Sequence, residues 1–203
     1  FSGNLLGTPG PSWITDPSLC KRGLCLNFDG VDDRVSIVNQ SVFIQMPLTL
    51  IGWAKFDTLP TALIPPHVEP LMIKADGSNN SWSFSVGNSP STPNRPFFTI
   101  FETSGVKHAV TADNPITTGT WWHQTGIVDA SGNMSLYINA VKQCSSGGSC
   151  NTCPTPNINV TSANLGLGAI AANGGEPTDG ILDELRIYNR VLSQEEISAI
   201  YTA

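Results

Sequence analysis

Charged residues are scarce in this sequence, and basic residues are the scarcer kind. Charged side chains make up 13% of the 203 residues; 10 lysines and arginines stand against 16 aspartates and glutamates, so the formal net charge is -6. Nucleic acids and anionic membranes attract proteins through a basic face. We therefore expect neither as a partner, whereas neutral sugars and bound cations are compatible with this composition.

Long apolar runs are also missing. No segment approaches the roughly 20 apolar residues of a membrane-spanning helix, so we expect no membrane insertion. The first residues, FSGN, have neither the charged start nor the apolar stretch of a secretory signal peptide. We therefore interpret the chain as a mature or excised piece of a longer protein.

The cysteines fall into two groups. Cys20 and Cys25 flank Lys-Arg-Gly-Leu, a spacing that a small disulfide loop can close, whereas Cys144, Cys150 and Cys153 crowd one loop. One disulfide in that loop would leave one thiol over. A zinc site is the alternative, because Cys150 and Cys153 form a C-x-x-C, but no second such pair exists. Disulfides indicate an oxidising, extracellular setting.

Short apolar segments separated by Gly, Pro, Ser and Asn predict an all-β fold. Apolar residues alternate over 24–38, and the segment 48–56 is apolar on both faces, so it should be a central strand covered on both sides. We count roughly a dozen short strands, one closing helix and no internal repeat, which predicts a single sandwich or barrel domain over residues 1–203.

The segment 179–201 reads as a strand, a turn and a short helix. Asp183, Leu185 and Ile187 should share one face of that strand. The Ser-Gln-Glu-Glu sequence that follows matches a capping box, which marks the start of a helix. A strand at this position needs a partner, and we predict that it pairs with the segment 24–38.

Five segments carry a family resemblance. They are LNFDGVDDRV at 26–35, LIGWAK at 50–55, WWH at 121–123, LYIN at 136–139 and GILDELRIYNRVLS at 180–193. In this order they resemble the motifs of laminin-G-like jelly-roll domains of the concanavalin A-like lectin/glucanase superfamily. The resemblance spans about residues 24–201 and implies two antiparallel sheets packed face to face, in an all-β jelly-roll sandwich.

The sequence departs from the family pattern at one hairpin. Ala140 stands where the family usually has glycine, which tolerates a positive φ without strain. The turn therefore uses Asn139 for that conformation or differs in type. The cysteine-rich insertion just after it is also unusual.

Members of this family often hold a structural calcium between the opening and closing segments, and the resemblance implies a Ca²⁺ here. Asp29, Asp32 and Asp33 cluster in a turn, and Asp183 lies on the strand expected nearby. Ca²⁺ takes carboxylate and carbonyl oxygens. We predict a site formed by Asp183 with Asp29 or Asp32. The alternative is that these aspartates are turn residues, solvated or paired with Arg34.

Sugar binding requires an aromatic platform and polar side chains around it. Trp121 matches a core position of the family, and Trp122 points the opposite way, so Trp122 is the candidate platform. Tyr137 on the hairpin, and Asn94 and Arg95 in one loop, are candidate polar contacts.

Catalysis is not expected. Glycosidases need two carboxylates that reach the scissile bond at set separations, and the adjacent Asp183 and Glu184 point to opposite faces. We therefore predict a non-catalytic extracellular carbohydrate-binding or adhesion module whose partner is a glycan or polysaccharide. The alternatives are a structural or protein-interaction head domain of a surface protein, and, less favoured, a glycoside hydrolase.

Overall fold

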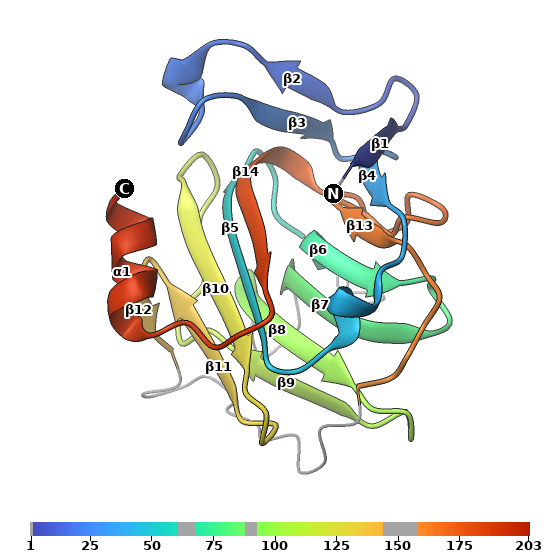
Figure 1. The fold of residues 1–203 in the computed structure, drawn as a ribbon. Helices are drawn as coiled ribbons and strands as arrows, with labels where there is room; N and C mark the ends of the chain where they lie inside the picture. Colours follow the sequence, from blue (N-terminus) through green and yellow to red (C-terminus); the bar gives the residue numbers. More distant parts are fainter. Residues whose placement is uncertain (1, 61–67, 88–92, 144–157) are drawn as a thin grey trace.

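The computed structural model describes residues 2–60, 68–87, 93–143 and 158–203, and these form a two-layer β-sandwich closed by one C-terminal helix (Figure 1). Sheet A has the order β1 (Gly3–Leu6), β4 (Arg34–Ile37), β13 (Leu165–Leu167), β6 (Val68–Ala75), β7 (Asn80–Gly87), β8 (Arg95–Phe101) and β9 (Lys107–Thr111). Sheet B has the order β12 (Val141–Lys142), β11 (Met134–Ile138), β10 (Trp122–Val128), β5 (Leu48–Phe56), β14 (Asp179–Tyr188), β3 (Cys25–Asp29) and β2 (Ser12–Ile14). Two 3-10 turns, η1 (Pro17–Leu19) and η2 (Ser41–Ile44), and the helix α1 (Gln194–Thr202) complete it. None of the helices in the described residues has the length and apolar character that crossing a bilayer needs. The all-β jelly-roll prediction is confirmed.

The two ends of the chain pair, as the sequence predicted. β14 lies between β5 and β3, and Asp179 to Leu182 pair with β3, with Asp179 opposite Asp29 (Figure 1). The two strands within 24–38 do not pair with each other, because β3 belongs to sheet B and β4 to sheet A. The turn at 30–33 therefore crosses from one layer to the other.

The predicted regular alternation of β14 is wrong, because the strand contains a β-bulge. The pairing with β5 shifts register between Asp183 and Arg186, and Glu184 adopts a φ of +50°. Leu185 consequently packs against the core between the sheets, whereas Asp183 lies beside the Cys20–Cys25 loop on the other face. Gly52 in β5 accommodates the bulge, since a Cβ there would lie 2.4 Å from Leu185 Cδ2.

The prediction that one central strand is covered on both faces is confirmed for β5. Leu50 and Phe56 lie in the main core between the sheets. On the opposite face, Ile51 belongs to a second apolar cluster that includes residues of α1. Trp53 stacks on Tyr201 of that helix, with ring centroids 5.5 Å apart. The helix therefore closes part of the outer face of sheet B.

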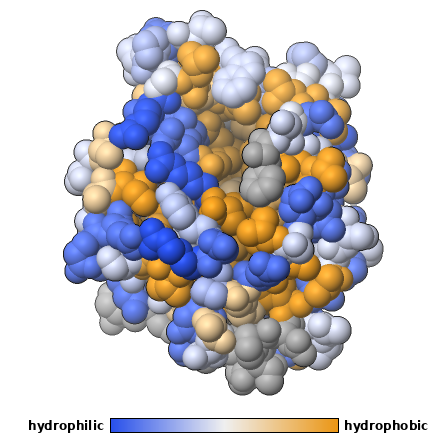
Figure 2. All heavy atoms as spheres, viewed as in Figure 1, coloured by the Kyte–Doolittle hydropathy of each residue, from blue (hydrophilic) through white to orange (hydrophobic). Residues whose placement is uncertain are grey.

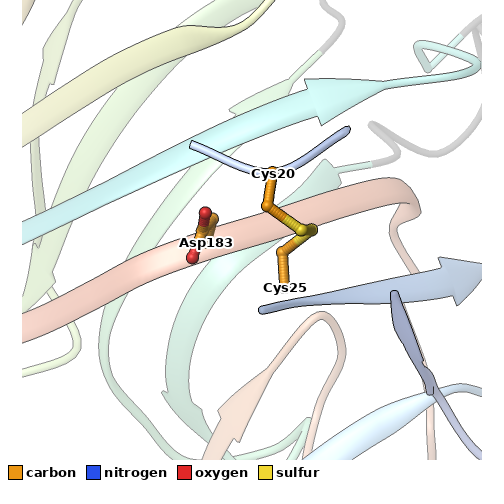
Figure 3. Close-up of side chains that lie close together, drawn as sticks. All are labelled: Cys20, Cys25 and Asp183. Atoms are coloured by element: carbon orange, nitrogen blue, oxygen red, sulfur yellow. A yellow bond between two sulfur atoms is a disulfide. The ribbon is translucent and has the colours of Figure 1, made fainter. Parts of the chain in front are cut away.

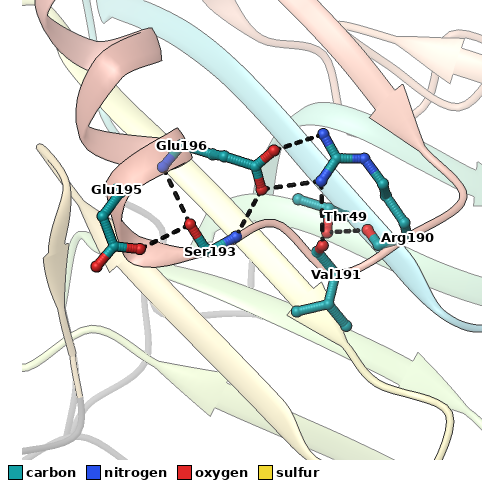
Figure 4. A network of polar contacts seen from close by, with 6 residues as sticks. All are labelled: Thr49, Arg190, Val191, Ser193, Glu195 and Glu196. Carbon is teal, nitrogen blue, oxygen red and sulfur yellow. Dashed lines mark hydrogen bonds and ion pairs between the residues drawn. The ribbon is translucent and has the colours of Figure 1, made fainter.

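The predicted capping box forms at the start of α1 (Figure 4). The Ser193 hydroxyl accepts from the Glu196 amide, and the Glu196 carboxylate accepts from the Ser193 amide at 2.9 Å. Arg190 donates to both carboxylate oxygens of Glu196, at 2.8 and 2.7 Å, and lowers the pKa of Glu196 to about 2. Thr49 of β5 donates to the Arg190 carbonyl at 2.6 Å, so the turn before the helix is tied to the sheet.

The sandwich is not fully closed where β14 leaves β3. Figure 2, in the same view as Figure 1, shows apolar side chains gathered in a hollow near the middle of the molecule, beside a band of hydrophilic residues. A cavity of about 310 Å³ between the sheets has only apolar side chains among its described lining residues, which are Ile37, Phe43, Met72, Leu165, Leu167, Leu185 and Ile187.

The hairpin in which Ala140 replaces glycine has a two-residue turn. Ile138 pairs with Val141, and the two residues between them, Asn139 and Ala140, have φ values of +50° and +63°. Positive φ at both central residues is the type I′ turn, which suits the twist of a hairpin. Ala140 itself therefore adopts the left-handed conformation, which costs an L-residue with a Cβ roughly 1–2 kcal/mol.

Glu69 is a carboxylic acid buried in the main core. It lies in β6 opposite the core residue Val86 and is 3% exposed, and none of the described residues forms a hydrogen bond with its Oε2. Burial raises the pKa of Glu69 to about 8, and the nearby charge of Asp179 contributes in the same direction. The carboxyl group of the folded protein therefore keeps its proton at neutral pH.

Replacing Ala140 with glycine should stabilise the protein by about 0.5–1 kcal/mol, because glycine removes the strain of the left-handed turn at a smaller entropic cost. Urea denaturation measures this change. Ala130→Gly is the matched control, since Ala130 is an exposed turn residue that is not among those with positive φ. Equal destabilisation by both substitutions would contradict the type I′ assignment.

The buried Glu69 should make the protein less stable as the pH rises. The unfolded chain loses this proton near pH 4.5 and the folded chain near pH 8. Between these values the folded state binds more protons, so the free energy of unfolding falls, by at most about 1.4 kcal/mol per pH unit. Glu69→Gln should gain stability relative to wild type across this interval in denaturant titrations. The matched control is Asp57→Asn, at an exposed position, whose free energy of unfolding should change with pH in parallel with that of wild type. A parallel pH dependence for Glu69→Gln would refute the raised pKa.

Candidate functional site

The outer face of sheet A, away from the main core, carries a groove of about 240 Å³. Residues of β6 to β9 form its floor, and Ile170 and Glu176, from the segment between β13 and β14, form one wall. The outer face of sheet B is partly covered by α1, whereas the described residues leave this groove open on the outer face of sheet A. This groove is the candidate ligand site.

Two phenylalanines and a hydroxyl line the groove from a single strand. Phe97, Thr99 and Phe101 alternate on the outer side of β8, while Phe98 and Ile100 point into the main core. Both rings that line the groove are partly exposed, whereas Thr99 is fully buried. The strand therefore presents two apolar surfaces with a polar group between them.

Two polar atoms in this lining have no hydrogen-bond partner among the residues that the structure describes. They are Thr99 Oγ1 and Asn80 Oδ1, and both are buried. A buried polar atom without a hydrogen bond costs about 1–3 kcal/mol, so such atoms are uncommon in native proteins. The groove lining thus contains two hydrogen-bonding groups that the described residues leave without a partner.

The charged groups of the groove lie at its edges. Lys107, the first residue of β9, places its Nζ 5.9 Å from the centroid of the Phe97 ring. Glu176 accepts a hydrogen bond from the Val68 amide at 3.0 Å.

The ligand contacts predicted from the sequence do not lie together. Trp122 packs against the main core and donates from Nε1 to the Thr117 carbonyl, whereas Tyr137 is 8% exposed within the cluster beneath α1. Asn94 and Arg95 lie at the start of β8, beyond the groove lining. The groove residues were missed, although the sequence FFTIF at 97–101 already alternates in the way that exposes Phe, Thr and Phe on one face.

Three aspartates of the turn between the sheets form an acidic cluster. One carboxylate oxygen each of Asp29, Asp32 and Asp33 lies within 4.8 Å of the others. Asp33 is 3% exposed; its Oδ1 has no hydrogen-bond partner within the described ranges, while its Oδ2 accepts from the Asp29 amide. Burial, together with the charges of Asp29 and Asp32, raises the pKa of Asp33. Arg34 donates to backbone carbonyls and, within the described residues, forms no ion pair with these carboxylates.

Asp183 lies apart from this cluster. It is four residues beyond Asp179 along β14, about 13 Å at ~3.3 Å per residue, whereas Asp179 is the residue opposite Asp29. The Oδ2 of Asp183 accepts from the amides of Lys21 and Arg22, at 2.8 and 2.9 Å. The structure therefore does not bring Asp183 together with Asp29 and Asp32.

The disulfide predicted between Cys20 and Cys25 is present, and Figure 3 shows the Asp183 carboxylate beside it. The two amides that Asp183 binds belong to residues inside the disulfide loop, so the carboxylate fixes this loop to sheet B. Cys144, Cys150 and Cys153 lie outside the described residues.

His123 is buried beneath the C-terminal helix. It is fully buried, neither ring nitrogen has a hydrogen-bond partner in the described part of the chain, and its ring centroid lies 5.0 Å from that of Trp53 and 5.6 Å from that of Tyr201. Burial, with smaller contributions from Arg186 and Lys21, lowers the pKa of His123 to about 4. The imidazole is therefore neutral at physiological pH and acts as an apolar packing group.

Solved structures of known proteins share this fold at low sequence identity. The binding domain of Paraclostridial mosquitocidal protein 1 matches with a TM-score of 0.70 and 14% identity, over 98% of this chain and 47% of that one. The binding domain of botulinum neurotoxin serotype D gives 0.65 and 15%, over 88% and 42%. The heptameric SAP-like pentraxin from Limulus polyphemus gives 0.61 and 13%, over 86% and 80%. The chain thus spans less than half the length of either toxin binding domain.

Family comparison agrees with the motifs read from the sequence. A search of curated proteins found no significant match. The Laminin_G_3 family model, described as "Concanavalin A-like lectin/glucanases superfamily", matches residues 29–198, which is most of the chain. The protein therefore belongs to the Laminin_G_3 family of the concanavalin A-like lectin/glucanase superfamily.

Proposed function

We propose that this protein is a non-catalytic extracellular binding module that takes a carbohydrate in the groove on the outer face of sheet A. The observation that carries the proposal is the pair of buried polar atoms without partners, Thr99 Oγ1 and Asn80 Oδ1, in a lining that includes Phe97 and Phe101. Sugar rings have an apolar face that stacks on aromatic rings and hydroxyls that both donate and accept hydrogen bonds.

The comparisons and the disulfide support a binding role outside the cell. The similar solved structures include domains named for binding in two toxins, and a pentraxin. The Cys20–Cys25 disulfide favours an oxidising compartment.

The groove chemistry supports binding over catalysis. Glycoside hydrolysis requires a pair of carboxylates, about 5–10 Å apart, flanking the scissile bond. Among the described residues that line the groove, Glu176 is the single carboxylic acid, and it accepts the Val68 amide. A sugar bound there meets no second carboxylic acid from the described lining residues.

A protein-interaction role is the second candidate, and one observation favours it. Trp13 is 55% exposed and lies in β2, the edge strand of sheet B. Exposed tryptophans are enriched where proteins meet, and an edge strand offers unpaired backbone groups. The two roles use different surfaces, so one set of variants separates them.

Glycan binding should depend on the groove and not on the edge strand. Phe97→Ala should weaken binding about tenfold by removing a stacking surface, and Thr99→Val should weaken it by removing a hydroxyl of similar shape. Glycan arrays identify a ligand, and calorimetry measures the affinities. Trp13→Ala is the matched control and should bind as wild type does. Loss of glycan binding in Trp13→Ala alone would shift the site to β2, and the absence of any bound glycan would refute the proposal.

We infer that the acidic cluster holds a Ca²⁺ ion, with Asp29, Asp32 and Asp33 as ligands. Ca²⁺–oxygen distances of about 2.3–2.6 Å place two ligands of one ion at most about 5 Å apart, and the three carboxylates lie within 4.8 Å. The unpartnered Oδ1 of buried Asp33 is the donor that such an ion would satisfy. Bound there, the ion would supply positive charge where the chain crosses between the sheets.

Removing one carboxylate should test this calcium site. Wild type should bind Ca²⁺ by calorimetry and melt at a higher temperature with it, since saturation at 100 times the Kd stabilises by about 2.7 kcal/mol. Asp33→Asn should lower the affinity at least about tenfold. Asp183→Asn should lower the melting temperature but leave Ca²⁺ affinity unchanged, because its carboxylate holds the disulfide loop. An Asp183→Asn variant that loses Ca²⁺ would instead support a site shared with Asp183.

A further inference from the structure

We propose that the groove on sheet A prefers acidic sugars, those with a single carboxylate or sulfate group, and that Lys107 is the residue that binds the charge. This inference rests on the proposed function, because it assumes that a sugar occupies the groove. It adds the chemical class of the ligand and a residue that determines specificity.

The position of the Lys107 ammonium carries the inference. Nζ lies 5.9 Å from the centroid of Phe97, one of the two rings on which a sugar would stack. A substituent of a sugar stacked on that ring therefore comes within reach of the ammonium group. Lys107 is itself exposed, so its side chain can adjust to the substituent.

Lys107 is also free to bind a ligand anion. The ion pairs of the described residues join His108 to Glu102, Arg186 to Glu184, and Arg190 to Glu196, and none includes Lys107. The lysine contacts an aromatic face instead, an interaction worth about 0.5–1 kcal/mol at an exposed site. A carboxylate or sulfate can replace that contact without breaking an existing ion pair.

The remaining charges of the groove define how many negative charges it can accept. Lys107 is the single cation among the described lining residues, and Glu176 is the single anion, held by the Val68 amide. One ammonium is a point charge with three donors, which matches a group with one negative charge. A densely charged ligand would meet Glu176 and a chain of net charge -6 without further cations to balance it.

Matched sugars test the inference. Oligosaccharides of galacturonate, glucuronate and 6-sulfated galactose are compared by calorimetry with counterparts in which the charged group is a neutral hydroxymethyl or hydroxyl. Wild type should bind at least one acidic member about three to ten times more tightly than its neutral counterpart. That preference should shrink as sodium chloride is added, because salt screens an exposed charge pair.

Two variants assign the preference to Lys107. Lys107→Gln should bind acidic and neutral members equally, and Lys107→Arg should keep the preference; their melting temperatures confirm that both fold. Equal wild-type affinities within every pair, or a preference that survives in Lys107→Gln, would overturn the inference and leave the proposed function standing. Absence of binding to every member, with no ligand on a broad glycan array, would overturn both.

Discussion

The structure depends on β14 lying between β5 and β3. Gly180 lets this strand approach its neighbour, since a Cβ there would lie 2.3 Å from the Lys55 carbonyl oxygen. Four residues later, Asp183 binds the amides of the disulfide loop, and the bulge that follows turns Leu185 into the core. The chain then reaches Arg190 and the capped helix α1. The strand β14 thus positions the disulfide loop near the N-terminus, part of the core, and the helix α1 that covers sheet B.

That cover buries the aromatic residues in the middle of sheet B. Sheet B is buried on its inner face by sheet A, and on its outer face Ile51 and Tyr137 lie beneath Leu192 and Ile197. An aromatic residue in the middle of sheet B therefore packs whichever way it points, as Trp122 and Trp53 do. The outer face of sheet A carries Thr99 and two partly exposed phenylalanines instead.

Much of the fold could be predicted from the sequence, because alternation and the family motifs report local geometry. The sequence allowed us to predict the burial of β5 on both faces, the pairing of β14 with β3 and the capping box. The bulge in β14 could not be predicted, because Glu184 is a residue type with no preference for a positive φ, and Asp183, Leu185 and Ile187 imitate a regular strand. The ligand residues predicted from the sequence could not be placed on one surface for a related reason. Alternation shows that Trp121 and Trp122 face opposite ways, but not which layer covers each side.

The acidic cluster shows how a local sequence feature acquires its chemistry from long-range burial. Three aspartates within five residues are ordinary in a solvated turn, yet here the chain crosses between the sheets and Asp33 is buried against Gly7. A buried carboxylate beside two others can be neutralised in two ways, by a proton or by a cation. The raised pKa of Asp33 reflects neutralisation by a proton. Because Ca²⁺ requires the ionised form, a proton and the proposed ion would compete for the same group, so the proposed Ca²⁺ affinity of this turn would fall with the pH.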